Sequence, residues 1–174
     1  MKCLIVVDYQ VDFVTGSLGF AKAEAIEDNI AEKIAEYRSN GSDIIFTFDT
    51  HGENYMETSE GKKLPVPHCI SGTSGHELYG KAAELRRDTD KSIFKPSFGS
   101  DELMDYLRGK NYDAVELIGV VTNICVISNA IIAKTALPEA DIIVDAACTA
   151  SNDDTLHEAA LDVMQGLQID VINR

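Results

Sequence analysis

Strand-like apolar runs alternate with helical segments along most of this 174-residue chain. Several of these runs are apolar at nearly every position, which is typical of parallel strands that are covered on both faces. The predicted strands are residues 3–8, 43–49, 91–95, 114–120, 141–146 and 168–172. Helical spacing or helix-capping residues predict helices over 24–40, 100–109, 124–137 and 151–166.

This order predicts an α/β fold, in which one mostly parallel, Rossmann-like sheet of about six strands lies between two layers of helices. The chain length suits one domain, which we place over residues 1–174 as a single three-layer α/β/α unit. The apolar runs are too short to span a bilayer. In sheets of this kind a ligand binds beyond the carboxyl ends of the strands, where the strand order reverses.

Four reactive side chains fall at or just after the predicted carboxyl ends of strands. They are Asp8, Asp49, Lys95 and Cys125. A cysteine in this place can act as a nucleophile if a carboxylate takes its proton and a lysine or a helix N-terminus stabilises the thiolate. Each residue alone also has an ordinary structural explanation, because strand-end acids cap loops, lysines are usually solvated, and free cysteines often pack in cores.

A second group of candidate residues lies in or beside residues 50–79, a segment with no sustained periodicity. Segments of about thirty irregular residues in a small domain are usually functional. The candidate ligands are Asp49, His51, Glu60 and His68. Carboxylates and imidazoles together suit zinc, with manganese or iron as alternatives. Their spacing matches no short regular metal motif, and His68 could equally pack a turn beside Pro67.

Charge and cysteine usage exclude several classes of partner. The formal net charge of −14 disfavours binding to nucleic acid or to an anionic membrane. The four cysteines are widely spaced and form no CxxC pair, which is typical of free thiols in a reducing compartment. The N-terminal residues lack the features of a signal peptide. We therefore expect a cytoplasmic protein that acts on a small molecule, and we expect it to be a homo-oligomer.

Four motifs, in order along the chain, resemble those of the isochorismatase-like cysteine hydrolase superfamily, and within it the nicotinamidases. The motifs are "VVDYQVDF", "FDTH…EGKKLPVPHC", "FKPSFGS" and "GVVTNICV", within a match from residue 3 to about residue 150. None of them would suffice alone, but together they are specific. The resemblance implies the isochorismatase-like hydrolase fold, and an amidase that converts nicotinamide to nicotinate and ammonia in NAD salvage.

The resemblance also implies roles for three catalytic side chains. Asp8 becomes the general base, Lys95 the residue that stabilises the thiolate, and Cys125 the nucleophile that forms a thioester. The family has a cis peptide bond before the nucleophile's turn, which corresponds here to Val120–Val121. The backbone N–H groups of Val121 and Cys125 would then form the oxyanion hole.

For the second group, the resemblance implies one divalent metal ion that binds the pyridine nitrogen of the substrate. Its ligands would be Asp49, His51, Glu60 and His68, and zinc is the favoured metal. Nicotinamidases usually have an aromatic residue shortly before the second metal histidine, whereas this chain reads "KKLPVP" there. We expect Leu64 to replace that aromatic wall and Phe13 to supply the other.

The departure at Leu64 bears on the exact substrate, and other functions explain parts of the sequence. The chain could be a sibling amidase acting on another small amide, or an isochorismatase-type hydrolase, although the latter would leave Cys125 unexplained. A non-catalytic metal-binding domain would leave the Asp, Lys and Cys set unexplained. In a hydrolase whose metal activates water, activity would survive the loss of Cys125.

Overall fold

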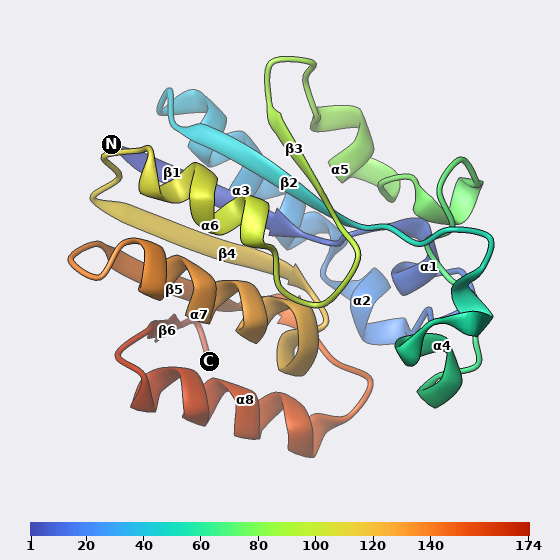
Figure 1. The fold of residues 1–174 in the computed structure, drawn as a ribbon. Helices are drawn as coiled ribbons and strands as arrows, with labels where there is room; N and C mark the ends of the chain where they lie inside the picture. The colour runs from blue at the N-terminus through green and yellow to red at the C-terminus, as the bar shows by residue number, and fades with distance from the viewer.

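Six strands form one sheet in the order β3-β2-β1-β4-β5-β6, and every neighbouring pair is parallel. The computed structural model describes residues 1–174 (Figure 1). The strands are β1 Lys2–Val7, β2 Asp43–Asp49, β3 Lys91–Lys95, β4 Ala114–Val120, β5 Asp141–Ala150 and β6 Asp170–Ile172. The predicted α/β fold with a six-stranded, mostly parallel sheet is therefore confirmed.

Helices cover both faces of this sheet, as the alternating order predicted. Helices α6, α7 and α8 lie on one face, while α3 and α5 lie on the other, with α1 and α2 near the carboxyl ends of the strands (Figure 1). The helices are α1 Val11–Val14, α2 Ala21–Ala25, α3 Glu27–Ser39, α4 Ser59–Lys63, α5 Gly80–Leu85, α6 Asp101–Arg108, α7 Ile127–Ala136 and α8 Asp154–Gly166. None of them combines the length and the apolarity that crossing a membrane would require.

Each face of the sheet has its own apolar core, because successive residues of a strand point to opposite faces. Ile5 and Val7 of β1 belong to the core under α6, α7 and α8, which also contains Leu107. Leu4 and Val6 of the same strand belong to the other core, which includes residues of α1, α3 and α5. The strand β1 is therefore buried on both sides, which explains its unbroken run of apolar residues.

Capping residues set two of the helix boundaries. Ser100 caps α6 as predicted, since its hydroxyl accepts a hydrogen bond from the N–H of Leu103 at 3.0 Å. The cap of α8 is Asp153 and not Ser151, because the Asp153 carboxylate accepts from the N–H of Leu156 at 2.9 Å. Helix α8 therefore begins at Asp154, three residues later than the sequence predicted.

Other elements differ from the predictions in position or length. The single helix predicted over 24–40 is two helices, since α2 ends at Ala25 and α3 begins at Glu27. The predicted irregular segment 50–79 contains two short 3₁₀ turns and α4, and α5 follows it unpredicted. Strand β5 continues to Ala150 because its pairing with β4 resumes after a register shift near Leu117 and Gly119. Strand β6 is shorter than predicted, beginning only at Asp170.

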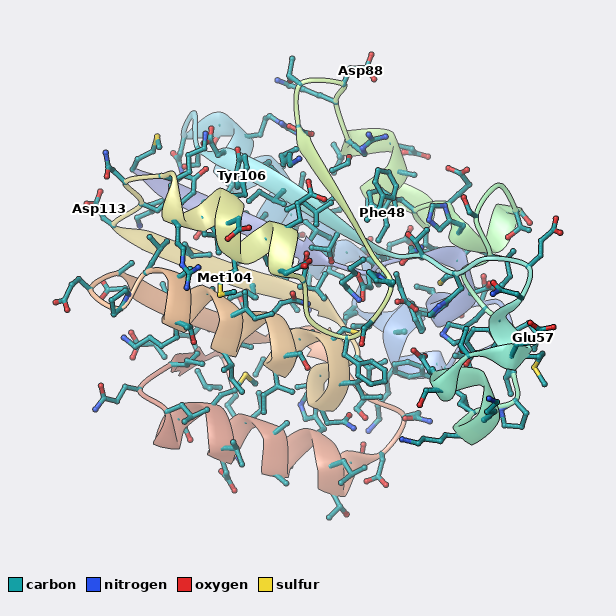
Figure 2. The ribbon with its side chains drawn as sticks, in the orientation of Figure 1. Phe48, Glu57, Asp88, Met104, Tyr106 and Asp113 are labelled. Carbon is teal, nitrogen blue, oxygen red and sulfur yellow. The ribbon has the colours of Figure 1, made fainter.

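The strand order determines where a ligand can bind. Strand β1 lies between β2 and β4, so the chain extends the sheet in one direction through β2 and in the other through β4. In sheets of this kind, such a reversal leaves a crevice at the carboxyl ends of the two central strands. Figure 2 shows Glu57, from the segment after β2, near that end of the molecule, and Asp113, just before β4, at the opposite end. The predicted reactive residues all lie at the end of the molecule that carries Glu57, where the strands have their carboxyl ends.

Candidate active site

Asp8, Lys95 and Cys125 meet at the carboxyl ends of β1, β3 and β4. Lys95 Nζ lies 2.6 Å from Asp8 Oδ2 and 3.5 Å from Cys125 Sγ. The Asp8 and Lys95 side chains are fully buried, and Cys125 is only 4% exposed. The structure thus brings the three residues together as a carboxylate, an ammonium and a thiol in one water-poor site.

Asp8 is held where β1 leaves the sheet. Its φ of 46° turns the chain away from β2, and its carboxylate Oδ1 accepts a hydrogen bond from Thr47 Oγ1 at 2.6 Å. The other oxygen, Oδ2, makes the ion pair with Lys95. Because both oxygens are engaged, the carboxylate is held in one orientation. The Lys95 Nζ atom also lies 3.6 Å from Asp49 Oδ1, so it contacts both carboxylates.

Burial controls the titration of this group of residues. Burial raises the pKa of Asp8 above its ordinary value, and the charge of Lys95 opposes that shift. Burial, with the nearby charge of Asp8, also raises the pKa of the Cys125 thiol well above its ordinary value, and Lys95 offsets only part of the shift. The resting thiol therefore carries its proton at neutral pH, next to a carboxylate whose raised pKa suits it to accept that proton.

Cys125 lies in a tight turn between β4 and α7. The Val120–Val121 peptide bond is cis, and a π-helical turn over Thr122–Val126 follows it. The carbonyl of Val121 accepts hydrogen bonds from the N–H groups of Ile124 at 3.0 Å and Val126 at 3.2 Å. The helix predicted over 124–137 thus begins as a wider turn, and regular α7 starts only at Ile127.

Gly119 allows the strand before this turn to approach β1 closely. It has a φ of 112° and pairs with Val7. A Cβ atom at this position would lie 2.1 Å from the carbonyl oxygen of Val7. Only glycine fits such a conformation and such a contact, so Gly119 brings the strand that leads to Cys125 against the strand that ends at Asp8.

The predicted metal ligands also converge. One donor atom from each of Asp49, His51, Glu60 and His68 lies within 4.8 Å of the other three. The Nε2 atoms of His51 and His68 lie 3.0 and 3.3 Å from Asp49 Oδ2. Two imidazoles and two carboxylates aimed at one point match the donor set that zinc, manganese or iron takes in proteins. These residues therefore fit a divalent metal ion.

Hydrogen bonds behind the ligands fix their direction. His68 Nδ1 lies 2.8 Å from the carbonyl oxygen of Val66 and donates to it, so Nε2, which faces Asp49 and Glu60, is the nitrogen that would bind a metal ion. The N–H of Cys69, the next residue, donates to Asp12 Oδ2 at 2.8 Å. Burial alone would raise the pKa of Asp49, but hydrogen bonds from His51 and His68 lower it below its usual range.

A small cavity of about 210 Å³ joins the two groups of residues. Its lining includes the predicted nucleophile Cys125 together with Asp49, Glu60 and His68 of the ligand set. Both predicted substrate-binding residues line it: Phe13 is buried with its ring centroid 5.5 Å from that of His68, and Leu64 is partly exposed. A larger depression of about 450 Å³ adjoins it and shares Glu60 and Leu64.

Several residues of the cavity were not predicted from the sequence. These are Leu18, Phe20, Phe98, Ile124 and Asn152, whereas Val121, which also lines the cavity, was predicted for the oxyanion hole. Phe98 lies in the "FKPSFGS" motif, where an aromatic residue in an otherwise polar loop was a usable signal. The histidines that were not assigned to the site do remain outside it: His76 contacts Thr50 at 2.9 Å, and His157 contacts Thr122 at 2.9 Å.

Known proteins resemble this chain over its whole length. A family model described as Isochorismatase domain matches residues 2–174. The crystal structure of a pyrazinamidase/nicotinamidase from Streptococcus mutans is 33% identical, has a TM-score of 0.88, and covers 99% of this chain and 100% of its own. The nicotinamidase/pyrazinamidase of Mycobacterium tuberculosis is 29% identical over 99% of this chain and 98% of its own. A pyrazinamidase of Pyrococcus horikoshii in complex with zinc is 25% identical, with a TM-score of 0.85 and 99% coverage of both chains.

Proposed function

The chain belongs to the isochorismatase family, and from this we propose that it is a nicotinamidase, which hydrolyses nicotinamide to nicotinate and ammonia. One observation carries the proposal: a single small cavity is lined by Cys125 and by three of the four metal-ligand candidates. A planar pyridine carboxamide carries its amide on a ring carbon apart from the ring nitrogen, so one small molecule can offer a group to each set of residues. The cavity is smaller than the roughly 300–1,000 Å³ of pockets for drug-sized ligands.

We assign the catalytic roles from the geometry of the buried trio. Cys125 Sγ attacks the amide carbon, and Asp8 takes the thiol proton as the C–S bond forms. Asp8 then gives that proton to the departing amine, so ammonia leaves and a thioester remains. A water molecule attacks the thioester and passes a proton to Asp8, and the C–S bond breaks to release the carboxylic acid. Asp8 then returns that proton to the Cys125 sulfur, which restores the thiol and the carboxylate.

Lys95 and the backbone of the nucleophile turn support these steps. The Lys95 ammonium lies 3.5 Å from the thiol and 2.6 Å from the carboxylate, so it stabilises whichever of the two carries the negative charge. We propose that the N–H groups of Val121 and Cys125 donate to the amide oxygen as it becomes negative. Phe13 and Leu64 confine the ring, and Phe98 adds an aromatic side chain in place of the one missing near Leu64.

The ligand set would hold a divalent ion, and we propose zinc. Asp49, His51, Glu60 and His68 provide four protein ligands, and the zinc-bound pyrazinamidase of Pyrococcus horikoshii supports this choice. When bound, the ion would supply a Lewis acid that attracts the pyridine nitrogen lone pair. The protein's part is to orient the ring so that its carboxamide faces Cys125.

Ammonia release from a panel of small amides tests the proposal. The panel contains nicotinamide and benzamide, which has the same shape but no ring nitrogen, together with non-aromatic amides. We expect nicotinamide to be hydrolysed with a kcat/KM at least about tenfold above that of benzamide, a difference of about 1.4 kcal/mol. Chelation should remove most of this preference. Equal rates on both rings, or a non-aromatic amide as the best substrate, would refute the pyridine anchor and favour a sibling amidase.

Two further expectations remain predictions. All four cysteines are free and buried, which fits a reducing compartment such as the cytoplasm. A homo-oligomer is the expected state in solution, and light scattering coupled to gel filtration measures it. A single species with the mass of one 19.0 kDa chain would refute it.

A further inference from the structure

The hydrogen-bond ladder between β1 and β2 has a gap beside the metal ligands. The two strands pair as far as Val7 and Thr47, and the N–H of Asp8 still donates to the carbonyl of Thr47 at 3.2 Å. The positive φ of Asp8 then turns the chain away from the sheet. Asp49, two residues further along β2, therefore has no β1 main chain beside it, although it is 3% exposed and its main-chain groups need partners.

The side chain of Gln10 fills this gap. Its Oε1 accepts a hydrogen bond from the N–H of Asp49 at 2.8 Å, and its Nε2 donates to the carbonyl of Asp49 at 3.0 Å. Nε2 also donates to the carbonyl of His76 at 2.8 Å. A primary amide carries the same donor and acceptor as a peptide group, so Gln10, which is fully buried, replaces the missing strand residue.

We propose that Gln10 is a positioning residue for the metal site, acting through the main chain of Asp49. Asp49 and His51 are both ligand candidates, and they lie on either side of the point where β2 ends. On the side of β3, the carbonyl of Lys95 holds the N–H of Thr50 at 2.9 Å. On the side of β1, the two hydrogen bonds between the Gln10 amide and the Asp49 main chain supply the corresponding support. Without them the main chain of Asp49 is held from the β3 side only, while His51 keeps its own main-chain hydrogen bonds to Cys69 and Ser71.

Asn129 performs the corresponding task for the nucleophile. Its Nδ2 donates to the carbonyl of Cys125 at 2.8 Å and to the carbonyl of Phe98 at 3.0 Å. Asn129 is also fully buried, and it lies in α7, on the face of the sheet opposite to α3. The hydrogen bonds of Gln10 do not include the nucleophile turn, and those of Asn129 do not include a metal ligand. The two amides therefore support the two parts of the site separately.

This separation gives a crossed test that uses zinc and an alkylating agent as probes. Gln10→Met keeps the shape of the side chain but removes its hydrogen bonds, and Asn129→Leu does the same for the other amide. Zinc affinity is measured by competition with a chromogenic chelator. Alkylation of Cys125 in the metal-free protein is measured with iodoacetamide and mass spectrometry of the peptide that contains it.

We expect Gln10→Met to weaken zinc binding by about 10–100-fold, the usual effect of losing a hydrogen bond behind a ligand, and to change Cys125 alkylation less than about twofold. Asn129→Leu should instead change the rate of Cys125 alkylation and leave zinc affinity within about twofold of the parent. Gln10→Glu keeps the acceptor for the Asp49 N–H but loses both donated hydrogen bonds, and it should weaken zinc binding to an intermediate extent. Each variant is checked for native circular dichroism in chelator.

Three results would overturn the proposal. The first is a Gln10→Met variant that binds zinc within about twofold of the parent. The second is an equal loss in both assays for both variants, which would mean general loosening. The third is failure of both Gln10 variants to fold, because Gln10 would then be a structural residue of the whole chain. The assignment rests on the proposed metal site and not on the substrate, so a parent protein that binds zinc but leaves nicotinamide intact would refute only the function.

Discussion

The two parts of the site are held in place in different ways. The nucleophile part, Asp8, Lys95 and Cys125, comes from positions far apart in the chain, but each lies at the end of a strand or just beyond it. The metal part comes from a stretch of twenty residues, 49–68, most of which lies outside the sheet. A parallel bridge between His51 and Ile70 ties it to the rest of that loop.

This difference shows which forces position each group. The sheet places the nucleophile part, since the strand order brings the ends of β1, β3 and β4 to one edge. Hydrogen bonds from single side chains position the metal part, such as those of Gln10 to Asp49 and of Asp12 to Cys69. Changes in the nucleophile part should therefore affect chemistry or global stability, and changes around the metal part should affect binding.

The largest expected effect is the loss of the nucleophile. Cys125→Ala should lower kcat for amide hydrolysis by at least about 10³-fold, as removal of a catalytic nucleophile does in other hydrolases. Zinc affinity should stay at the parent value, because Cys125 donates to none of the metal ligands. Cys148→Ala, which removes a buried thiol elsewhere in the chain, is the control. Substantial turnover by Cys125→Ala would mean that another group, such as metal-activated water, attacks the amide.

The second effect is on stability. Lys95→Met leaves the buried carboxylate of Asp8 without its partner, and it should lower the free energy of unfolding by about 3–5 kcal/mol. Lys91→Met, on the same strand, breaks an exposed pair with Glu102 and should cost less than about 1 kcal/mol. Urea unfolding in chelator measures both. Equal destabilisation by the two variants would contradict the view that the sheet encloses a buried charge at Lys95.

A smaller effect is expected at the wall that faces both parts. Phe98 lines the cavity but is 43% exposed, so Phe98→Ala should raise KM for nicotinamide by about 3–10-fold, or roughly 1 kcal/mol of lost contact, with little change in kcat. Phe94→Ala is the matched control, because Phe94 is 52% exposed on β3 and stacks on Phe48 outside the cavity. If kcat fell as much as KM rose, the Phe98 ring would be supporting the nucleophile turn and not only binding the substrate.

The smallest effect concerns pH. Burial lowers the pKa of His157, whose ring contacts Thr122 of the nucleophile turn. The unfolded chain therefore binds this proton at a higher pH than the folded chain does. The free energy of unfolding should fall as the pH drops below about 6.5, and the loss should end at the lower pKa of the folded state.

Comparison with His157→Gln isolates this contribution. The parent should lose more stability than the variant between about pH 7 and about pH 5, by less than about 1 kcal/mol because the ring is only half-buried. Urea midpoints for both proteins, recorded in chelator to keep His51 and His68 free of metal, provide the measurement. Parallel pH profiles would show that His157 titrates as it does in water.

The succession of strands along the chain and the clustering of reactive residues at one edge were predictable from the sequence, whereas the spatial order of the strands was not predicted. Buried parallel strands leave unbroken apolar runs, and the residue that ends each run identifies the edge where ligands bind. Asp8 and Lys95 could therefore be placed at that edge from the pattern of the chain alone. Side-chain chemistry made them candidates for a base and a thiolate-stabilising lysine, and made Glu60 a candidate ligand, but the resemblance assigned these roles, since no spacing rule links positions so far apart.

Local hydrogen bonds decided what the sequence could not predict. The helix over 151–166 was placed too early because Ser151 and Asp153 are both good caps, and only the folded geometry shows which carboxylate or hydroxyl reaches the helix. The π-helical turn at Cys125 has no periodicity of its own over five residues. Gln10 is a polar residue close to a catalytic one in the sequence, and nothing in that position shows that its amide would continue a β ladder.

Gly119 has a consequence for the tolerance of this chain to mutation. Every amino-acid replacement of a glycine introduces a Cβ atom, and here that atom would press on the carbonyl of Val7. The strands that lead to the base and to the nucleophile would be forced apart, although the altered residue touches neither reacting group. Selection for the reaction should therefore be as strict at this position, which has no side chain, as at Cys125.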